Sequence, residues 1–175
     1  VDSNSWGLFE MNAVDSGLPV DSKTKEIIHN TLNWMVNDLK SEAAQNANWK
    51  VLVLHHPYTD EFNNKHIVPI VERYNVNFVI SGHLHYYIKN ISINPEVGAK
   101  TVYITQGSVQ DGESELDLGS YDKRLLAEFP EVVAIGRENY GCLNITKDKL
   151  LYSDSHNFLS STNFSPNLSL SNPKV

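Results

Sequence analysis

Two stretches decide the fold of this chain: VLVLHHPY at residues 51–58 and SGHLHYY at residues 81–87. In the first, a run of branched apolar residues stops at two histidines. In the second, the apolar run at residues 78–80 stops at Ser-Gly-His. Runs of this length are too short for helices and are typical of strands buried on both faces of a parallel sheet. The sequence therefore predicts two buried strands, each followed by histidines.

Helical patterns precede and separate the two predicted strands. Apolar residues recur at spacings of three and four over residues 22–40, where Asp21 and Ser22 offer capping oxygens, and again over residues 67–74. The order helix, strand, helix, strand predicts parallel strands joined by a right-handed crossover. Ligands of open α/β sheets bind beyond the carboxyl ends of the strands, which is where both histidine clusters fall.

From residue 101 onward, the sequence pattern indicates strands and a polar tail instead of alternating helices and strands. Residues 101–105 read as a strand, and residues 143–146 and 150–152 read as a hairpin that turns at Lys147 and Asp148. Residues 157–175 are rich in Ser, Asn and Pro, a composition that does not drive collapse on its own. We expect one domain over residues 1–156, followed by a polar tail.

Composition excludes two classes of partner. The chain has 175 residues and a formal net charge of -7, so it offers no basic stripe for a nucleic acid. No stretch approaches the roughly 20 apolar residues of a membrane span.

Four Asn-x-Ser/Thr sequons, which accept glycans only on a eukaryotic secretory route, begin at Asn90, Asn144, Asn163 and Asn167.

The histidines suggest metal chemistry. Neutral imidazole is a common ligand of Zn, Fe and Mn, and four imidazoles follow the two strands: His55, His56, His83 and His85. Each one alone is more often an ordinary polar residue at a strand end, but two clusters on consecutive strands favour a shared site. Gly82 is expected to permit the tight turn before His83.

The two histidine blocks resemble the last two signature blocks of the calcineurin-like metallophosphoesterase superfamily. TVYITQG at residues 101–107 and RENYGCLNI at residues 137–145 resemble segments of its purple acid phosphatase branch. The resemblance implies an α/β fold: the C-terminal half of a four-layer α/β/β/α sandwich, in which helices flank a mixed sheet. Together with the sequons, it favours a secreted or extracytoplasmic protein.

The resemblance also implies roles for individual residues. His55 and His83 match ligands of the second metal of a dinuclear centre, and His85 matches a ligand of the first. His56 and His66 are expected on the substrate side, as candidate catalytic residues. The metals implied are Fe with Zn, Mn or a second Fe.

The upstream blocks of the superfamily, Gly-Asp and Gly-Asn-His, have no counterpart in this sequence. We therefore expect half a site, to be completed by an N-terminal half of the same protein. The complete protein would hydrolyse phosphate esters as an acid phosphatase-like phosphomonoesterase. The alternatives are an inactive phosphatase-like scaffold or binding domain, and a mononuclear zinc module with Asp60 as a fourth ligand.

Overall fold

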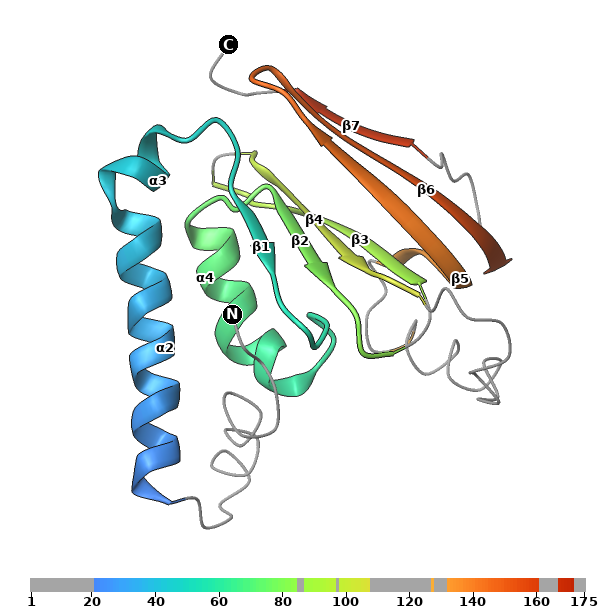
Figure 1. Cartoon of the computed structure of the whole chain (residues 1–175). Coiled ribbons are helices and arrows are strands. Elements are labelled where there is room, and N and C mark those ends of the chain that lie inside the picture. The colour runs from blue at the N-terminus through green and yellow to red at the C-terminus, as the bar shows by residue number, and fades with distance from the viewer. Residues whose placement is uncertain are drawn as a thin grey trace.

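The computed structural model of the chain describes residues 21–84, 87–96, 98–107, 127, 132–160 and 167–171. Its described strands form one mixed sheet, with helices against one face (Figure 1). The strand order across the sheet is β1-β2-β4-β3-β5-β6-β7. The strands are β1 (Val51–Val53), β2 (Phe78–Ser81), β3 (Tyr87–Ile93), β4 (Lys100–Thr105), β5 (Val132–Ile145), β6 (Lys149–Ser160) and β7 (Asn167–Ser171).

The first helix among the described residues has the bounds that its apolar spacing predicts. Helix α2 (Ser22–Lys40) begins after Asp21, whose carboxylate accepts hydrogen bonds from the backbone N–H groups of Lys23 and Thr24. Ile28, Met35 and Leu39 are its buried residues and give it one apolar face. A short helix, α3 (Glu42–Asn46), follows before β1.

The crossover between β1 and β2 contains a π-helix. The π-helix η2 (Asn63–Ile67) continues directly into α4 (Val68–Arg73). Pro69 lies just beyond η2, and a proline inside a helix both removes a hydrogen bond and crowds the carbonyl four residues before it. Pro69 lies in the first turn of α4, where a missing N–H is tolerated, and the regular helix continues past it to Arg73.

The parallel arrangement predicted from the alternation is confirmed. Strand β1 pairs with β2 and β2 pairs with β4, both in parallel. The carboxyl ends of these three strands therefore meet at one edge of the sheet. Strand β3 returns antiparallel beside β4.

The C-terminal hairpin is longer than predicted. Strands β5 and β6 pair antiparallel around the expected turn, but they extend over 14 and 12 residues. Within the segment expected as a polar tail, β6 reaches Ser160 and β7 pairs with the start of β6.

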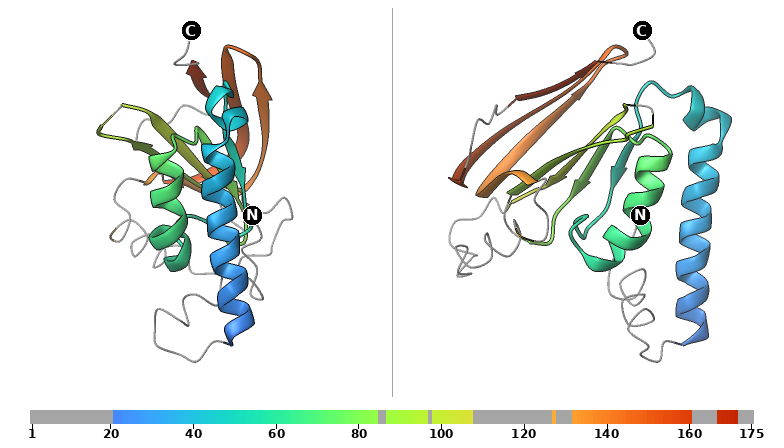
Figure 2. Two further views of the ribbon diagram at one scale, coloured as in Figure 1. Left: turned by 90° about the vertical axis from the view of Figure 1, so that its left-hand side faces the viewer. Right: turned by 180° about the vertical axis from the view of Figure 1, so that it is seen from behind.

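Hydrophobic clusters lie on both faces of the sheet. One packs α2, η2 and α4 against it, with Ile28, Val71 and Val79 among its members. The other packs the β5–β6 hairpin against the opposite face, where the Tyr152 ring centroid is 5.4 Å from that of Phe78. Figure 2 shows the helices and the hairpin on either side of the central strands. The predicted mixed α/β fold is thus confirmed, although the described residues contain no second helical layer.

Two further sequence features are placed by the structure. The side chain of Asn90 is 3% exposed on β3, so the folded chain does not present this sequon to solvent, whereas Asn144 is exposed. Asn163 lies outside the described residues. None of the helices that the structure describes is both long and apolar enough to cross a membrane.

Candidate metal centre

Backbone hydrogen bonds join the loops that follow β1 and β2. The N–H of Leu54 donates to the carbonyl of Ile80 at 3.0 Å, which extends the pairing one residue beyond β1. The N–H of Gly82 then donates to the carbonyl of His55 at 2.9 Å. The two histidine loops are therefore fixed to each other by the backbone, independently of any ligand.

His83 is held in a strained turn. Its φ is 73°, and the N–H of Leu84 donates to the carbonyl of Gly82 at 2.9 Å, which together define a γ-turn centred on His83. This form of γ-turn is rare and strained. The residue with positive φ is thus His83 and not the glycine on which the sequence placed the turn. A Cβ at position 82 would lie 3.9 Å from the His55 carbonyl oxygen, an ordinary contact.

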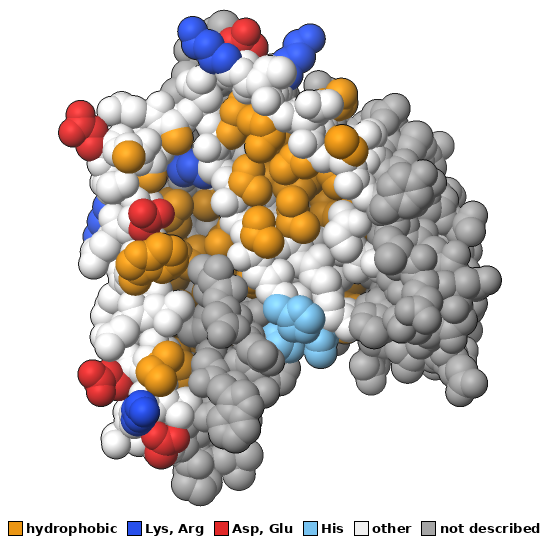
Figure 3. Space-filling view, in the orientation of Figure 1, with side chains coloured by type: hydrophobic (Ala, Val, Ile, Leu, Met, Phe, Trp, Pro, Cys, Tyr) orange, Lys and Arg blue, Asp and Glu red, His pale blue; other side chains and the backbone are white. Residues whose placement is uncertain are grey.

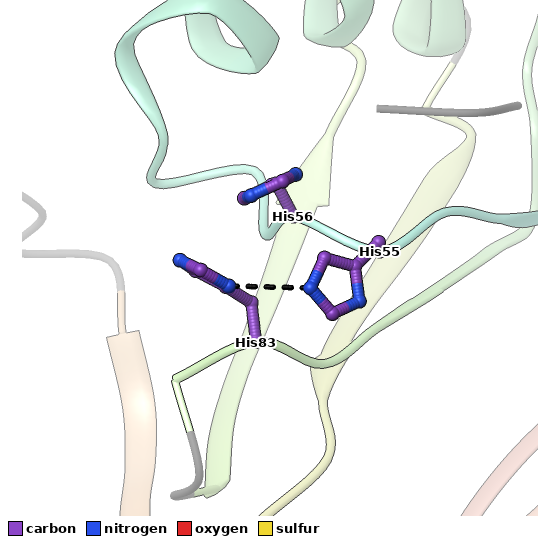
Figure 4. A group of neighbouring side chains, drawn as sticks. All are labelled: His55, His56 and His83. Carbon is purple, nitrogen blue, oxygen red and sulfur yellow. Dashed lines mark hydrogen bonds between the residues drawn. The ribbon is translucent and has the colours of Figure 1, made fainter. Parts of the chain in front are cut away.

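Three imidazoles converge at this edge of the sheet (Figure 4). The Nδ1 of His83 lies 3.2 Å from the Nε2 of His55. The ring centroid of His56 lies 4.7 Å from that of His55 and 4.2 Å from that of His83. One ligand nitrogen from each ring lies within 4.8 Å of the others.

The donor set fits a borderline-soft cation such as zinc. Two nitrogens bound to one tetrahedral zinc ion at about 2.05 Å lie about 3.3 Å apart. The nitrogens of His55 and His83 are already at 3.2 Å. His56 is 5% exposed and the other two rings are exposed, so the group has one buried wall and one open side.

The remaining predicted site residues are distributed around this group. His56, expected on the substrate side, lies within it and can reach the same cation position. His66 lies on η2, and its ring centroid is 4.8 Å from that of Phe62. His85 falls outside the described residues. Asp60 accepts the N–H groups of Phe62 and Asn63 with its carboxylate, which is the role of a helix cap.

Sequence reasoning missed Asn63. Its side-chain amide donates to the carbonyl oxygens of His56 at 2.9 Å and Pro57 at 3.0 Å. The residue is 1% exposed. The sequence gives no reason to choose Asn63 over the neighbouring Asn64, because the register of the π-helix decides which of the two side chains is buried.

Hydrogen bonds also connect the carboxyl ends of β2 and β4, next to the loop that carries His83. The hydroxyl groups of Ser81 and Thr105 lie 3.1 Å apart, and both side chains are buried. The N–H of Gln106 donates to the Ser81 carbonyl at 2.7 Å. The ends of β2 and β4 are therefore connected directly below the His83 turn.

Comparison with known proteins gives a family match over the first half of the chain. Residues 5–87 match the sequence model of the calcineurin-like phosphoesterase family, a range that contains all three converging histidines. The fold is similar to the solved structure of PhoD, with a TM-score of 0.50 and 14% sequence identity. That match covers 77% of this chain and 35% of the PhoD chain, so this chain spans about a third of that relative's length. No curated protein matches the chain.

Proposed function

Because this chain belongs to the calcineurin-like phosphoesterase superfamily, we propose that His55, His56 and His83 hold a metal ion that serves phosphate ester hydrolysis. The observation that carries the proposal is the 3.2 Å separation between the ligand nitrogens of His55 and His83. These residues lie 28 positions apart in the sequence, and the parallel pairing of β1 with β2 brings them together.

The three histidines would act as neutral ligands. When bound, a cation would supply Lewis-acid stabilisation of the phosphate oxygens and would activate a water molecule for attack. Protons compete for the same imidazole lone pairs, so acid would weaken binding. The open side of the group, where His55 and His83 are exposed, leaves room for the phosphate.

The finer assignment follows the purple acid phosphatase resemblance. We infer a dinuclear centre of Fe with Zn, Mn or a second Fe, in which His85 binds the first metal and His55 and His83 bind the second. Phosphate monoesters are the proposed substrates. His66, which lies on the crossover that follows the first histidine loop, is proposed to face the substrate. The resemblance implies the same position for His56, but the convergence of its ring with those of His55 and His83 favours a ligand role instead.

An N-terminal half of the same protein is the proposed source of the remaining ligands. Among the described strands, β1 is the edge strand on one side of the sheet. Beside it lies a surface made by Trp34, Val51 and Val53, which we call the β1 surface; these side chains are 58%, 37% and 60% exposed. They also line a cavity of about 290 Å³.

The position of this surface supports the proposal. Figure 3 shows hydrophobic side chains gathered on this face of the molecule, with the histidines directly below them. Large exposed apolar patches mark interaction sites. A polypeptide that covers the β1 surface would place its own side chains next to the metal ligands.

Metal binding by the purified chain tests the proposal. We expect the wild-type chain to bind zinc with about one equivalent per chain at neutral pH, as three imidazoles can. A His55→Ala, His83→Ala variant should lose that binding. His29→Ala, which removes an exposed histidine on α2, is the matched control and should retain it.

Hydrolysis is tested separately on the complete protein with an aryl phosphate. Loss of activity in the double variant, with retention in His29→Ala, is the expected result. A wild-type chain that binds no metal and a complete protein without hydrolytic activity would together favour the scaffold alternative and overturn the proposal.

A further inference from the structure

We propose that Asn63 is a positioning residue, which orients the first histidine loop for metal binding. The inference rests on the proposed function, because it concerns the same three-histidine group. Asn63 does not contact the cation position in this scheme. It acts on the backbone that carries His55 and His56.

Three consecutive carbonyl groups of the first histidine loop accept hydrogen bonds from identified donors. The carbonyl of His55 accepts from the N–H of Gly82, and the carbonyls of His56 and Pro57 accept from the amide of Asn63. The orientation of successive peptide planes determines where the intervening side chains point. The peptide planes on either side of His56 are thus held by Gly82 and by Asn63, while the Pro57 carbonyl also accepts the N–H of Asp60 at 3.1 Å.

Asn63 is itself held in place. It is the first residue of η2, where the N–H of Val68 donates to its carbonyl across the wide π turn. The carboxylate of Asp60 accepts its N–H at 3.4 Å and that of Phe62 at 3.1 Å. Short π-helical segments occur frequently at functional sites, and this one directs a buried amide back to the histidine loop.

Folding stability alone does not account for an asparagine at position 63. The side chain is 1% exposed, and its Oδ1 accepts no hydrogen bond from the described residues. A buried acceptor without a donor is costly, so an apolar residue of similar size would suit the packing better. What the asparagine supplies is the donor to the His56 carbonyl and a second donor to the Pro57 carbonyl beside the N–H of Asp60.

A cobalt titration of the full chain tests this inference. Co²⁺ alone is the probe, and its visible absorption reports both affinity and coordination geometry. We expect Asn63→Leu to weaken Co²⁺ binding about 10-fold, the lower end of the effect of altering residues that orient metal ligands. Asn64→Leu, at the neighbouring exposed position of the same π-helix, should bind with unchanged affinity.

Thermal unfolding of the metal-free proteins is measured alongside. A merely structural role would lower the unfolding temperature of Asn63→Leu and leave the Co²⁺ affinity of the folded protein unchanged, which would overturn the inference. If Asn63→Leu does not fold, Asn63→Ser replaces it, because one hydroxyl can donate to only one of the two carbonyls. Wild-type affinity in Asn63→Ser would likewise overturn the inference.

The outcome also separates this inference from the proposed function. A wild-type chain that binds no Co²⁺ overturns both. A wild-type chain that binds Co²⁺, together with a Asn63→Leu chain that binds it equally well, overturns only the role of Asn63.

Discussion

His83 carries the strain of the site in its own backbone. Its φ of 73° belongs to a region that residues with a side chain seldom occupy. Strained backbone of this kind costs on the order of 1–3 kcal/mol and persists where the surrounding structure imposes it. Here the hydrogen bond between Gly82 and His55 imposes it, and the result is a ring aimed at His55.

Replacing His83 with glycine should therefore separate stability from metal binding. We expect His83→Gly to raise the free energy of unfolding of the metal-free chain by about 1 kcal/mol, because glycine tolerates positive φ. Zinc affinity should fall in the same variant, because a ligand is lost. Asn75→Gly is the control: Asn75 also has positive φ, 52°, but lies outside the histidine group. Asn75→Gly should leave zinc affinity unchanged; a fall equal to that of His83→Gly would contradict this explanation.

Asp21 should make the stability of α2 depend on pH. Hydrogen bonds from the Thr24 side chain and from backbone N–H groups lower the pKa of this carboxyl below its usual 3.8. A lowered pKa in the folded state contributes stability that is present above pH 3.8 and is lost as the pH falls through the folded value. Helical circular dichroism of the wild-type chain should therefore decrease over that acid range.

The matched variant for this test is Asp21→Asn. Asparagine caps helices well but does not titrate, so its contribution to the helix signal should not change over the acid range. The difference between the two proteins isolates the carboxyl group. An identical acid transition in both would show that Asp21 is not responsible.

At the scale of elements, the β5–β6 hairpin reaches the site through Tyr152. This residue is 2% exposed, contacts Phe78 on β2, and its hydroxyl accepts from the Gln106 side chain at 2.5 Å. Gln106 follows β4 at the edge where the histidines gather. The hairpin therefore supports the carboxyl ends of the parallel strands as well as covering one face of the sheet.

The packing of Tyr152 depends on Gly141. Tyr152 lies opposite Leu143 in the hairpin, and a Cβ at Gly141 would overlap the Tyr152 ring. Overpacking of this kind costs about 1–3 kcal/mol, so Gly141→Ala should lower the free energy of unfolding by that amount. Cys142→Ala, at the adjacent exposed position, should change it by less than about 0.5 kcal/mol. Chemical denaturation measures both, and equal stability of the two variants would contradict the predicted overlap.

At the scale of the whole molecule, the sheet leaves apolar side chains exposed near the three converging histidines. The β1 surface contains Trp34 at 58% and Val53 at 60% exposure beside a cavity of about 290 Å³. Surfaces of this kind promote association when they are not covered. In the complete protein we propose that the N-terminal half covers them.

The isolated chain should therefore self-associate through this surface. We expect Trp34→Gln to shift the chain toward the monomer in sedimentation experiments, because it removes the largest exposed apolar side chain of the β1 surface. Ile93→Gln is the matched control, since Ile93 is 58% exposed at the end of β3. An equal shift in both variants would indicate nonspecific hydrophobic association instead of association through the β1 surface.

Local patterns predicted some elements well. The bounds of α2 followed from apolar spacing and the Asp21 cap, and β1 and β2 followed from two short branched runs, because these signals are contained within a few neighbouring residues. The full length of β5 and β6 was not predictable, since their outer parts are specified by pairing with each other and with β3 and β7. Strand β7 was missed because its alternating Leu168 and Leu170 form only a short pattern within a Ser/Asn-rich segment, and its position is set by pairing with β6.

The sequence by itself determined that histidines follow two consecutive buried strands and that these strands run parallel, because apolar runs and their order in the chain are local properties. Only the tertiary structure decided which rings meet: His56 joins His55 and His83, while His66 stacks on Phe62. It also decided that Asn63, and not Asn64, faces the histidine loop. The physical reason is that side-chain direction depends on backbone conformation, here a γ-turn and a π-helix, and on the hydrogen bonds of Gly82 to His55 and of Asn63 to His56, which form only once the chain has folded.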